Sequence, residues 1–235
     1  MQIAFFVVAA VPLLLLFYVW YLDRNEREPF DLMAKVFLAS ALLGTASAGI
    51  LETIGQLLLQ FTILGYIPIV RDIVFYFVVV AFVEEFCKRL PVMKLVWKSP
   101  NLNYRFDAIV YCVTAAIGFA VAENLMYVCA FGGSVMLGRL FPVHAICGVF
   151  MGYYMACAKI YQKSGDRDTC KRYLWMSLLV PMLIHGTWDV CVSASQWADP
   201  ITATVLMYLA FIGLIVMTVV AFLRLRTYAK FDSPL

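Results

Sequence analysis

Ionisable side chains recur inside apolar stretches of this sequence, where a charge is costly unless it is paired or hydrated. Glu84, Glu85 and Lys88 lie in the segment VEEFCK, directly after the apolar run FVVVAF. On a helix, Glu84 and Lys88 share a face because they are four residues apart, and they can form an ion pair. Glu85 is rotated by about 100° from Glu84, which predicts that one carboxylate lies in a site and the other beside it.

Three later apolar stretches carry more groups of this kind. Glu123 and Asn124 lie in GFAVAENLMY, His144 lies in FPVHAICGVFMGYY, and His185 and Asp189 lie in LLVPMLIHGTWDV. The chain contains no other histidine. His185 and Asp189 are four residues apart, as a histidine ligand and a second ligand or an orienting carboxylate would be on one helix. These residues predict a polar pocket in the middle-to-outer half of a bilayer.

Carboxylates and neutral imidazoles can bind Zn²⁺, which in hydrolases has three protein ligands and a water molecule. A further carboxylate can accept the proton of that water as a general base. We expect Glu123, His144 and His185 to be the zinc ligands. The base is expected to be Glu84 or Glu85, with Glu84 favoured because it shares a face with Lys88. The supporting residues would be Lys88, Asn124 and Asp189.

Each group also has a purely structural interpretation. Glu84 and Lys88 can be an ion pair near the inner interface, and His185 can be a core donor to a backbone carbonyl. Asp189 can serve only to cap a helix or to orient a neighbouring side chain. However, burying carboxylates and histidines on four consecutive apolar stretches would cost much free energy if these residues served packing alone.

The composition indicates what positions these residues. The chain has 235 residues, of which 64% are hydrophobic and 14% are charged, whereas about a quarter of the residues of a soluble domain are charged. We expect one all-α membrane helix bundle that forms a single domain over residues 1–235. The net charge of +3 comes without a basic stripe, which argues against a nucleic-acid partner. The seven cysteines are scattered singly and indicate no disulfide framework.

The apolar stretches predict about seven membrane-spanning helices. They lie at about 2–22, 32–62, 73–97, 107–131, 140–161, 173–197 and 201–223. The first lacks the basic start and the A-x-A cleavage site of a signal peptide, so we expect it to be retained. The second is interrupted by glycines, Glu52 and Gln60, which predicts a re-entrant or broken segment in 52–66. Gly148 and Gly152 form a G-x-x-x-G motif, typical of close helix packing.

The basic residues alternate between the connections of these helices. The connections after the first, third and fifth stretches, and the segment after the seventh, contain most of them: Arg24, Arg27, Lys35, Lys88, Arg89, Lys94, Lys98, Arg105, Lys159, Lys163, Arg167, Lys171, Arg172, Arg224, Arg226 and Lys230. The positive-inside rule therefore predicts an N-terminus outside and a C-terminus in the cytoplasm. We expect a multi-pass protein of a bacterial or archaeal cytoplasmic membrane.

Four motifs in order resemble the PrsW family of intramembrane proteases, a branch of the superfamily that includes CAAX prenyl endopeptidases and bacteriocin-processing proteases. EEFCK reads as E-E-x-x-K, FAVAEN as F-x-x-x-E-N, HAICG as H-A-x-x-G with a G-Y-Y tail, and HGTWD as H-G-x-x-D. The resemblance covers residues 77–190, about half of the chain. Other branches usually carry histidine at the position of Glu123, which favours the PrsW branch over prenyl-protein processing.

The resemblance implies regulated intramembrane proteolysis, in which a single-span membrane protein such as an anti-sigma factor receives its first cut. It implies essential roles for Glu84, Glu85, Glu123 and His185, with His144 as a fifth catalytic residue. In the superfamily, a glutamate–histidine pair can also activate water without a zinc ligand set. The other histidine and its i+4 partner would then stabilise the oxyanion. We expect the cut near the substrate's extracytoplasmic juxtamembrane segment.

Two other classes of protein are compatible with buried charges. A transporter could use the glutamates, Lys88 and the histidines as a proton or cation relay, although such proteins often show two related halves that are not visible here. A sensor or scaffold with seven spans would tolerate loss of these residues and would be expected to have larger loops.

Overall fold

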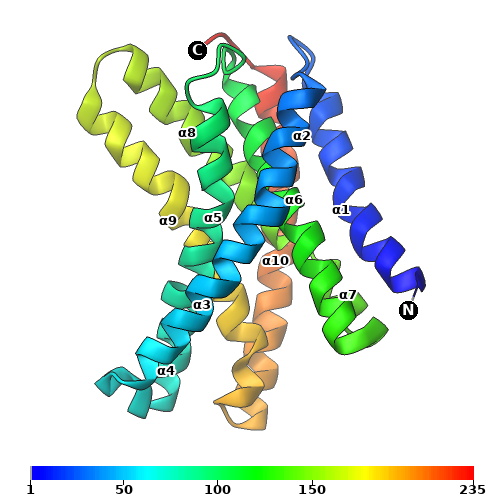
Figure 1. The fold of residues 1–235 in the computed structure, drawn as a ribbon, viewed down its shortest axis with the longest axis vertical. Coiled ribbons are helices and arrows are strands. Elements are labelled where there is room, and N and C mark those ends of the chain that lie inside the picture. The colour runs from blue at the N-terminus through cyan, green and yellow to red at the C-terminus, as the bar shows by residue number, and fades with distance from the viewer. Residues whose placement is uncertain (1) are drawn as a thin grey trace.

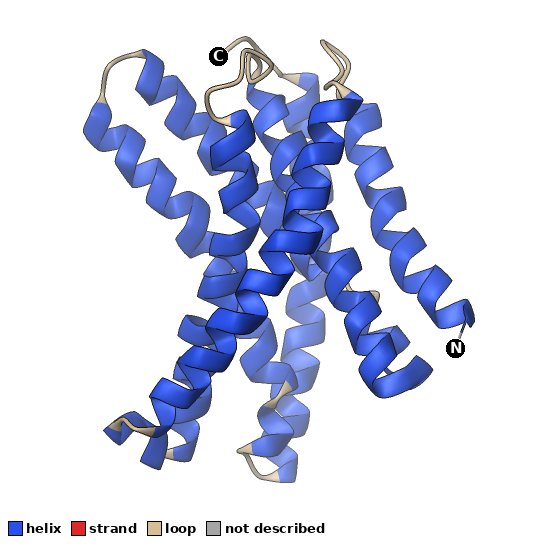
Figure 2. Cartoon of the chain, in the orientation of Figure 1, coloured by secondary structure: helices blue, strands red, loops and turns tan. Residues whose placement is uncertain are grey.

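A computed structural model describes residues 2–235 and confirms the predicted all-α fold. The described residues form helices joined by short connections, with no strand among them (Figures 1 and 2). The α-helices are α1 (Gln2–Leu22), α2 (Phe30–Leu38), α3 (Thr45–Gln60), α4 (Pro68–Val74), α5 (Phe82–Pro91), α6 (Arg105–Phe131), α7 (Met136–Arg139), α8 (Val143–Lys163), α9 (Arg167–Val192) and α10 (Pro200–Lys230). The π-helical segments are η1 (Ala39–Gly44), η3 (Phe75–Ala81) and η4 (Val92–Val96), and the 3₁₀ segments are η2 (Ile63–Tyr66), η5 (Gly132–Val135) and η6 (Ala194–Gln196).

Six helices of the described chain are long and apolar enough to cross a membrane. They are Gln2–Leu22, Phe30–Gln60, Arg105–Val135, Val143–Lys163, Arg167–Val192 and Pro200–Lys230. The remaining predicted span, the third at about 73–97, corresponds to α4, η3, α5 and η4, which follow one another without a break from Pro68 to Val96. This segment is less apolar than the other six because it carries the charged VEEFCK motif. The six apolar helices of spanning length make the chain a multi-pass membrane protein.

The second span differs in detail from the prediction. α2, η1 and α3 form one continuous helix through Gln60, and the chain reverses only in the short turn at 61–67. The glycines at 44, 49 and 55 do not interrupt this helix. Its irregularity is the π-helical segment η1, and a second π-helical segment, η3, comes directly before the helix that carries Glu84 and Glu85. Such segments are frequent near functional sites because they shift the faces of a helix.

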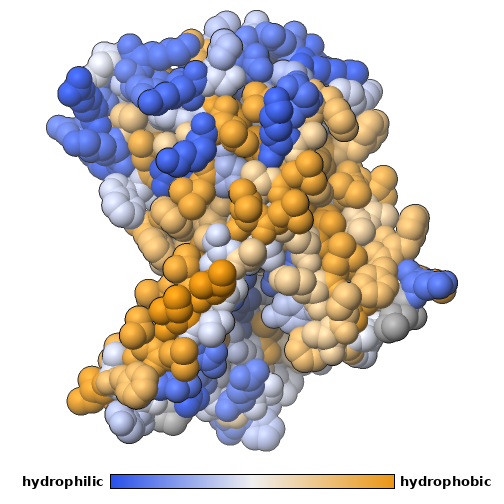
Figure 3. Space-filling model, in the orientation of Figure 1, coloured by the Kyte–Doolittle hydropathy of each residue, from blue (hydrophilic) through white to orange (hydrophobic). Residues whose placement is uncertain are grey.

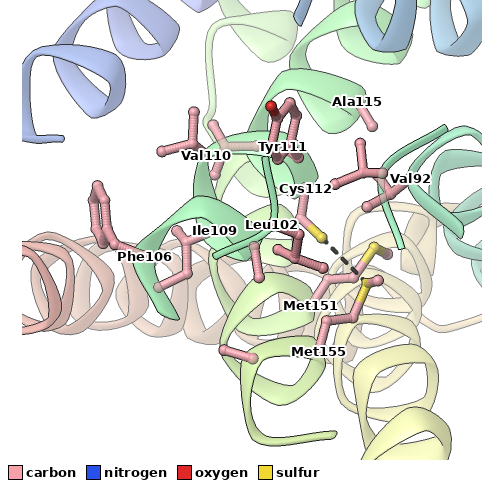
Figure 4. Close-up of a cluster of buried hydrophobic side chains, with 14 of the residues drawn as sticks. Val92, Leu102, Phe106, Ile109, Val110, Tyr111, Cys112, Ala115, Met151 and Met155 are labelled. Atoms are coloured by element: carbon pink, nitrogen blue, oxygen red, sulfur yellow. Dashed lines mark hydrogen bonds between the residues drawn. The ribbon is translucent and has the colours of Figure 1, made fainter. Parts of the chain in front are cut away.

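α6 lies at the centre of the bundle. Almost every side chain from Phe106 to Ala120 is buried, because α6 packs against α8 on one side and against α1 and α2 on others. α9 covers the far side of α8. Figure 4 shows part of this core, where the Cys112 thiol of α6 lies 3.4 Å from the sulfur of Met155 on α8. A central helix with buried sides fixes the positions of its neighbours.

The outer surface is suited to lipid. Large apolar side chains such as Leu14, Ile50 and Ile212 are exposed, and hydrophobic residues cover much of the middle of the face in Figure 3. Hydrophilic residues gather at the end of the molecule that holds the C-terminus. This distribution matches a bundle that spans a bilayer.

The G-x-x-x-G motif lies at the closest approach of α8 to α6, as predicted. A Cβ atom on Gly148 would lie 2.9 Å from Cβ of Ala116, and one on Gly152 would fall on the backbone of Ile109. The clash at Gly152 cannot be relieved by a side-chain movement, because the atoms that a Cβ would meet belong to the main chain of α6. The two glycines therefore set the spacing between the helices that carry Glu123 and His144.

Replacing Gly152 by leucine is expected to destabilise the protein by about 1–3 kcal/mol or more, because overpacking forces the backbones of α6 and α8 apart. Thermal unfolding in detergent measures the change. Gly49→Leu is the control, since a Cβ at Gly49 meets no atom within 4 Å. Equal unfolding temperatures for the two variants would contradict the close packing.

Candidate active site

Lys88 is the centre of a buried cluster on α5. Its Nζ donates to Oε2 of Glu84 at 2.9 Å and to Oε1 of Glu85 at 2.8 Å, and the lysine side chain has no exposed surface. Lys88 follows the two glutamates by four and three positions, so one flexible side chain reaches both. The expectation that only one glutamate faces the site therefore does not hold: both carboxylates turn toward the same ammonium group.

His144 joins this cluster from the first turn of α8. Nζ of Lys88 lies 2.9 Å from Nδ1 of His144, and Nε2 of His144 lies 2.8 Å from Oε2 of Glu123 on α6. An ammonium group can only donate, so Nδ1 accepts and the ring proton is on Nε2, which donates to Glu123. His144 thus links the α5 cluster to the carboxylate of α6.

His185 enters from α9 and contacts both glutamates of α5. Its Nδ1 lies 3.0 Å from Oε1 of Glu85, and its Nε2 lies 3.9 Å from Oε2 of Glu84 and 3.3 Å from Oδ2 of Asp189. A carboxylate accepts, so Nδ1 donates to Glu85 and the Nε2 atom points toward Glu84 and Asp189. The rings of His144 and His185 lie edge to face with their centres 5.1 Å apart.

The opposite edge of the cluster is closed by Arg139, which the sequence did not single out. Its Nη2 lies 2.5 Å from Oε2 of Glu123, and its Nε donates to Oδ1 of Asn124 at 2.9 Å. The guanidinium also lies over the ring of Tyr127, 4.1 Å from its centre. The available signal was that Arg139 is the basic residue of the connection between the fourth and fifth predicted spans. Asn124, predicted as a supporting residue, holds it in place.

The cluster contains the ligands that a catalytic metal would need. One atom from each of Glu84, His144 and His185 lies within 4.8 Å of the others, and one carboxylate with two histidines is a known ligand set of catalytic Zn²⁺. Oε2 of Glu85 is buried beside them without a hydrogen-bond partner among the described residues. These residues fit a metal ion, and His144 would ligate it through a nitrogen that gives up its contact with Lys88 or Glu123. Glu123, which the sequence suggested as a ligand, lies outside this closest group because it contacts His144 and Arg139.

Three of the helices bring their site residues to a similar distance from one end of the bundle. Glu123 and His185 lie about 27 Å from the first residues of α6 and α9, and His144 lies about 28 Å from the last residue of α8, at 1.5 Å per residue. All three reference points lie at the end of the bundle that holds the C-terminus. α8 begins at Val143, so His144 lies at the site in the first turn of this helix.

A helical membrane protein that gathers glutamates, histidines and an aspartate at one depth inside its bundle has the site of a membrane-embedded hydrolase. The family model of the PrsW family intramembrane metalloproteases matches residues 28–221. The chain therefore belongs to the PrsW family, and it is an intramembrane protease of the bacterial plasma membrane.

Individual relatives agree with the family match. The protein is 31% identical to Protease PrsW of Clostridioides difficile (strain 630), over 84% of this chain and 83% of the relative. It is 30% identical to Protease PrsW of Geobacillus kaustophilus (strain HTA426), over 77% and 76% of the two chains. Protease PrsW of Bacillus subtilis (strain 168) is 37% identical over 49% of this chain and 53% of its own. No solved structure matches. These relatives favour the protease over the transporter alternative.

Proposed function

We propose that the chain, as a single protease domain over residues 1–235, cuts a single-span membrane protein near its extracytoplasmic juxtamembrane segment. An anti-sigma factor in regulated intramembrane proteolysis is a substrate of this kind. The observation that supports the proposal is the depth of the cluster. Measured along their helices, Glu123, His144 and His185 lie roughly 27 Å from the end of the bundle that holds the C-terminus. The positive-inside rule assigns this end to the cytoplasm, and the hydrocarbon core is about 30 Å thick.

An apolar groove beside the cluster supports a substrate that lies in the membrane. The groove has a volume of about 450 Å³ and is formed by α8, α9 and α10. Val143 and Ile184 line it and come directly before His144 and His185. A membrane helix that entered this groove would bring its unwound end to the two histidines. A peptide bond needs to be unwound there, because helical hydrogen bonds shield its carbonyl from attack.

The catalytic residues in this proposal are Glu84, Glu85, Glu123, His144 and His185. Glu84 and Glu123 are the glutamates that the two assignments below exchange between two tasks, ligation of a metal ion and acceptance of the proton of water. The sequence favours Glu123 as the ligand and Glu84 as the base, whereas the interatomic distances favour Glu84 as the ligand. In the second assignment Glu123 is the base, which it would be through Oε1, because Oε2 already contacts Nε2 of His144 and Nη2 of Arg139.

The other residues prepare the site. Lys88 neutralises the two carboxylates of α5, and Glu85 orients the ring of His185 through Nδ1. Asp189 lies beside Nε2 of the same ring, where the pair can stabilise the developing oxyanion if Asp189 carries a proton. A bound metal ion, which we propose to be Zn²⁺, would polarise the scissile carbonyl and acidify water. Without such an ion, a glutamate and a histidine would have to activate the water themselves.

Cleavage in reconstituted vesicles tests the function. Purified protein mixed with a single-span substrate is expected to produce one cut on the extracytoplasmic side of that segment, located by mass spectrometry of the fragments. A zinc chelator is expected to stop the reaction, and added Zn²⁺ to restore it. A cut on the cytoplasmic side would contradict the proposed depth. Proton-coupled uptake without any cleavage would replace the protease by the transporter.

Metal content in the same preparations separates the two assignments. If Glu84 is the ligand, Glu84→Gln lowers bound zinc while Glu123→Gln retains it, and the reverse holds if Glu123 is the ligand. His185→Ala is expected to lower bound zinc in both cases. Glu52→Gln is the control, because this half-buried glutamate of α3 makes no hydrogen bond or ion pair with the described residues. Wild-type protein without metal that still cleaves would support metal-free activation of water.

A further inference from the structure

A second group of carboxylates lies at the end of the bundle that holds the C-terminus. Glu28 comes from the connection between α1 and α2, and Asp107 from the first turn of α6, and their exposed fractions are 4% and 0%. Asp23, at the start of the same connection, is 1% exposed. One oxygen from each of the three side chains lies within 4.8 Å of the others. Asp107 and Glu123 are separated by about 24 Å along α6, so this group is distinct from the active site.

The hydrogen bonds of this group leave several oxygens unused. Glu28 accepts from the hydroxyl of Tyr111, and Oδ2 of Asp107 accepts from the backbone N–H groups of Asn103 and Tyr104 at 2.9 and 2.6 Å. Oδ1 of Asp107 has no partner, and neither oxygen of Asp23 has one among the described residues. An almost fully buried aspartate with both oxygens unpartnered therefore points into the group formed by Glu28 and Asp107.

No positive charge of the described chain compensates these carboxylates. None of the ion pairs involves Asp23, Glu28 or Asp107. Burial and the neighbouring charge of Asp107 raise the pKa of Asp23 to about 7, and burial raises the pKa of Glu28. A buried carboxylate without a partner is costly, so the group needs either protons or a cation.

We propose that Asp23, Glu28 and Asp107 form a binding site for a hard divalent cation, Mg²⁺ or Ca²⁺. All three side chains are carboxylates, and Asp23 and Asp107 have oxygens without a hydrogen-bond partner, which suits hard cations. The site contains no imidazole or thiolate, so it differs chemically from the histidine cluster that suits Zn²⁺. If this end of the bundle faces the cytoplasm, as the basic residues predict, Mg²⁺ is the abundant candidate.

The position of the site gives the cation a structural task. The C-terminal segment passes beside it, where Oδ1 of Asp232 accepts from the backbone N–H of Phe106 at 2.9 Å and Oδ2 accepts from the Asn25 side chain at 3.0 Å. A cation on the three carboxylates would join the α1–α2 connection to the start of the central helix α6. Removing it would loosen these segments without touching the catalytic residues.

Binding of Mn²⁺, followed by electron paramagnetic resonance, tests the site in purified His185→Ala protein, where the histidine cluster is weakened. We expect one Mn²⁺ per chain, displaced by Mg²⁺ or Ca²⁺ in excess. Asp23→Asn and Glu28→Gln are each expected to weaken binding by at least about tenfold, whereas Glu26→Gln, an exposed glutamate in the same connection, leaves it unchanged. No Mn²⁺ bound, or equal weakening by all three variants, would overturn the proposal.

Thermal unfolding gives a second measurement that does not depend on a folded variant. In wild-type protein, millimolar Mg²⁺ or Ca²⁺ after treatment with a chelator is expected to raise Tm by about 5 °C, because a ligand that binds only the folded state stabilises it. An unchanged Tm would show that protons, and no cation, neutralise the three carboxylates. Cleavage activity is not part of this test, so its result is independent of the proposed function.

Discussion

Replacing Glu84 by glutamine is expected to lower the rate of cleavage by about 10³-fold, because the variant loses either the general base or a metal-ligating carboxylate. Glutamine has nearly the same shape and can still accept a hydrogen bond from Lys88. Glu84 is close to the rim of the cluster, with a side chain 6% exposed, so the loss of one negative charge there leaves Lys88 paired with Glu85. The protein is therefore expected to fold normally.

Single-turnover cleavage of a single-span substrate in vesicles measures this loss, and thermal unfolding in detergent reports the fold. Glu52→Gln controls for the removal of a glutamate from the membrane interior. Glu84→Asp is expected to have an intermediate rate of cleavage, since it keeps the negative charge but its side chain is shorter by one methylene group. Full activity of Glu84→Gln would remove Glu84 from the catalytic residues and leave Glu85 and Glu123 as the candidates.

The sequence predicted the all-α bundle and the convergence of its charged motifs, because both depend on local properties. Apolar stretches of sufficient length predict spans, and a four-residue spacing predicts that Glu84 and Lys88 pair. Neither property sets the height of one helix relative to the next. The depth of His144 depends on where α8 begins, which is one residue earlier, at Val143.

Other features depended on contacts between distant segments. In the sequence, Arg139 resembles an ordinary residue of a connection between spans, and only the structure places its guanidinium on Glu123. Asp23 and Asp107 look like charges at the ends of spans, where water would solvate them, and only the packing of the α1–α2 connection against α6 buries both. Both α5 glutamates join one cluster because the long side chain of Lys88 reaches them both. The 100° rotation between neighbouring residues of a helix does not take this reach into account.

Lys88→Met is expected to destabilise the protein by about 3–5 kcal/mol, because it leaves two carboxylates in the membrane interior without their counter-charge. The methionine side chain fills a similar volume, so packing is not the main loss. The ammonium group also contacts the ring of Phe119, 4.4 Å from its centre, and Nδ1 of His144. Thermal or SDS-induced unfolding in detergent measures the change, and Lys88→Arg, which keeps the charge, is expected to lose less.

A second substitution separates charge compensation from packing. Glu85 is the deepest carboxylate, with no exposed side-chain surface, so Glu85→Gln removes one of the two charges that Lys88 neutralises. The double variant Lys88→Met/Glu85→Gln is expected to be more stable than the sum of the single effects predicts, by about 1–3 kcal/mol. Its activity is expected to stay low, since His185 loses the acceptor that orients it. Additive effects on stability would mean that Lys88 acts through its volume, and that the buried glutamates are kept neutral by protons.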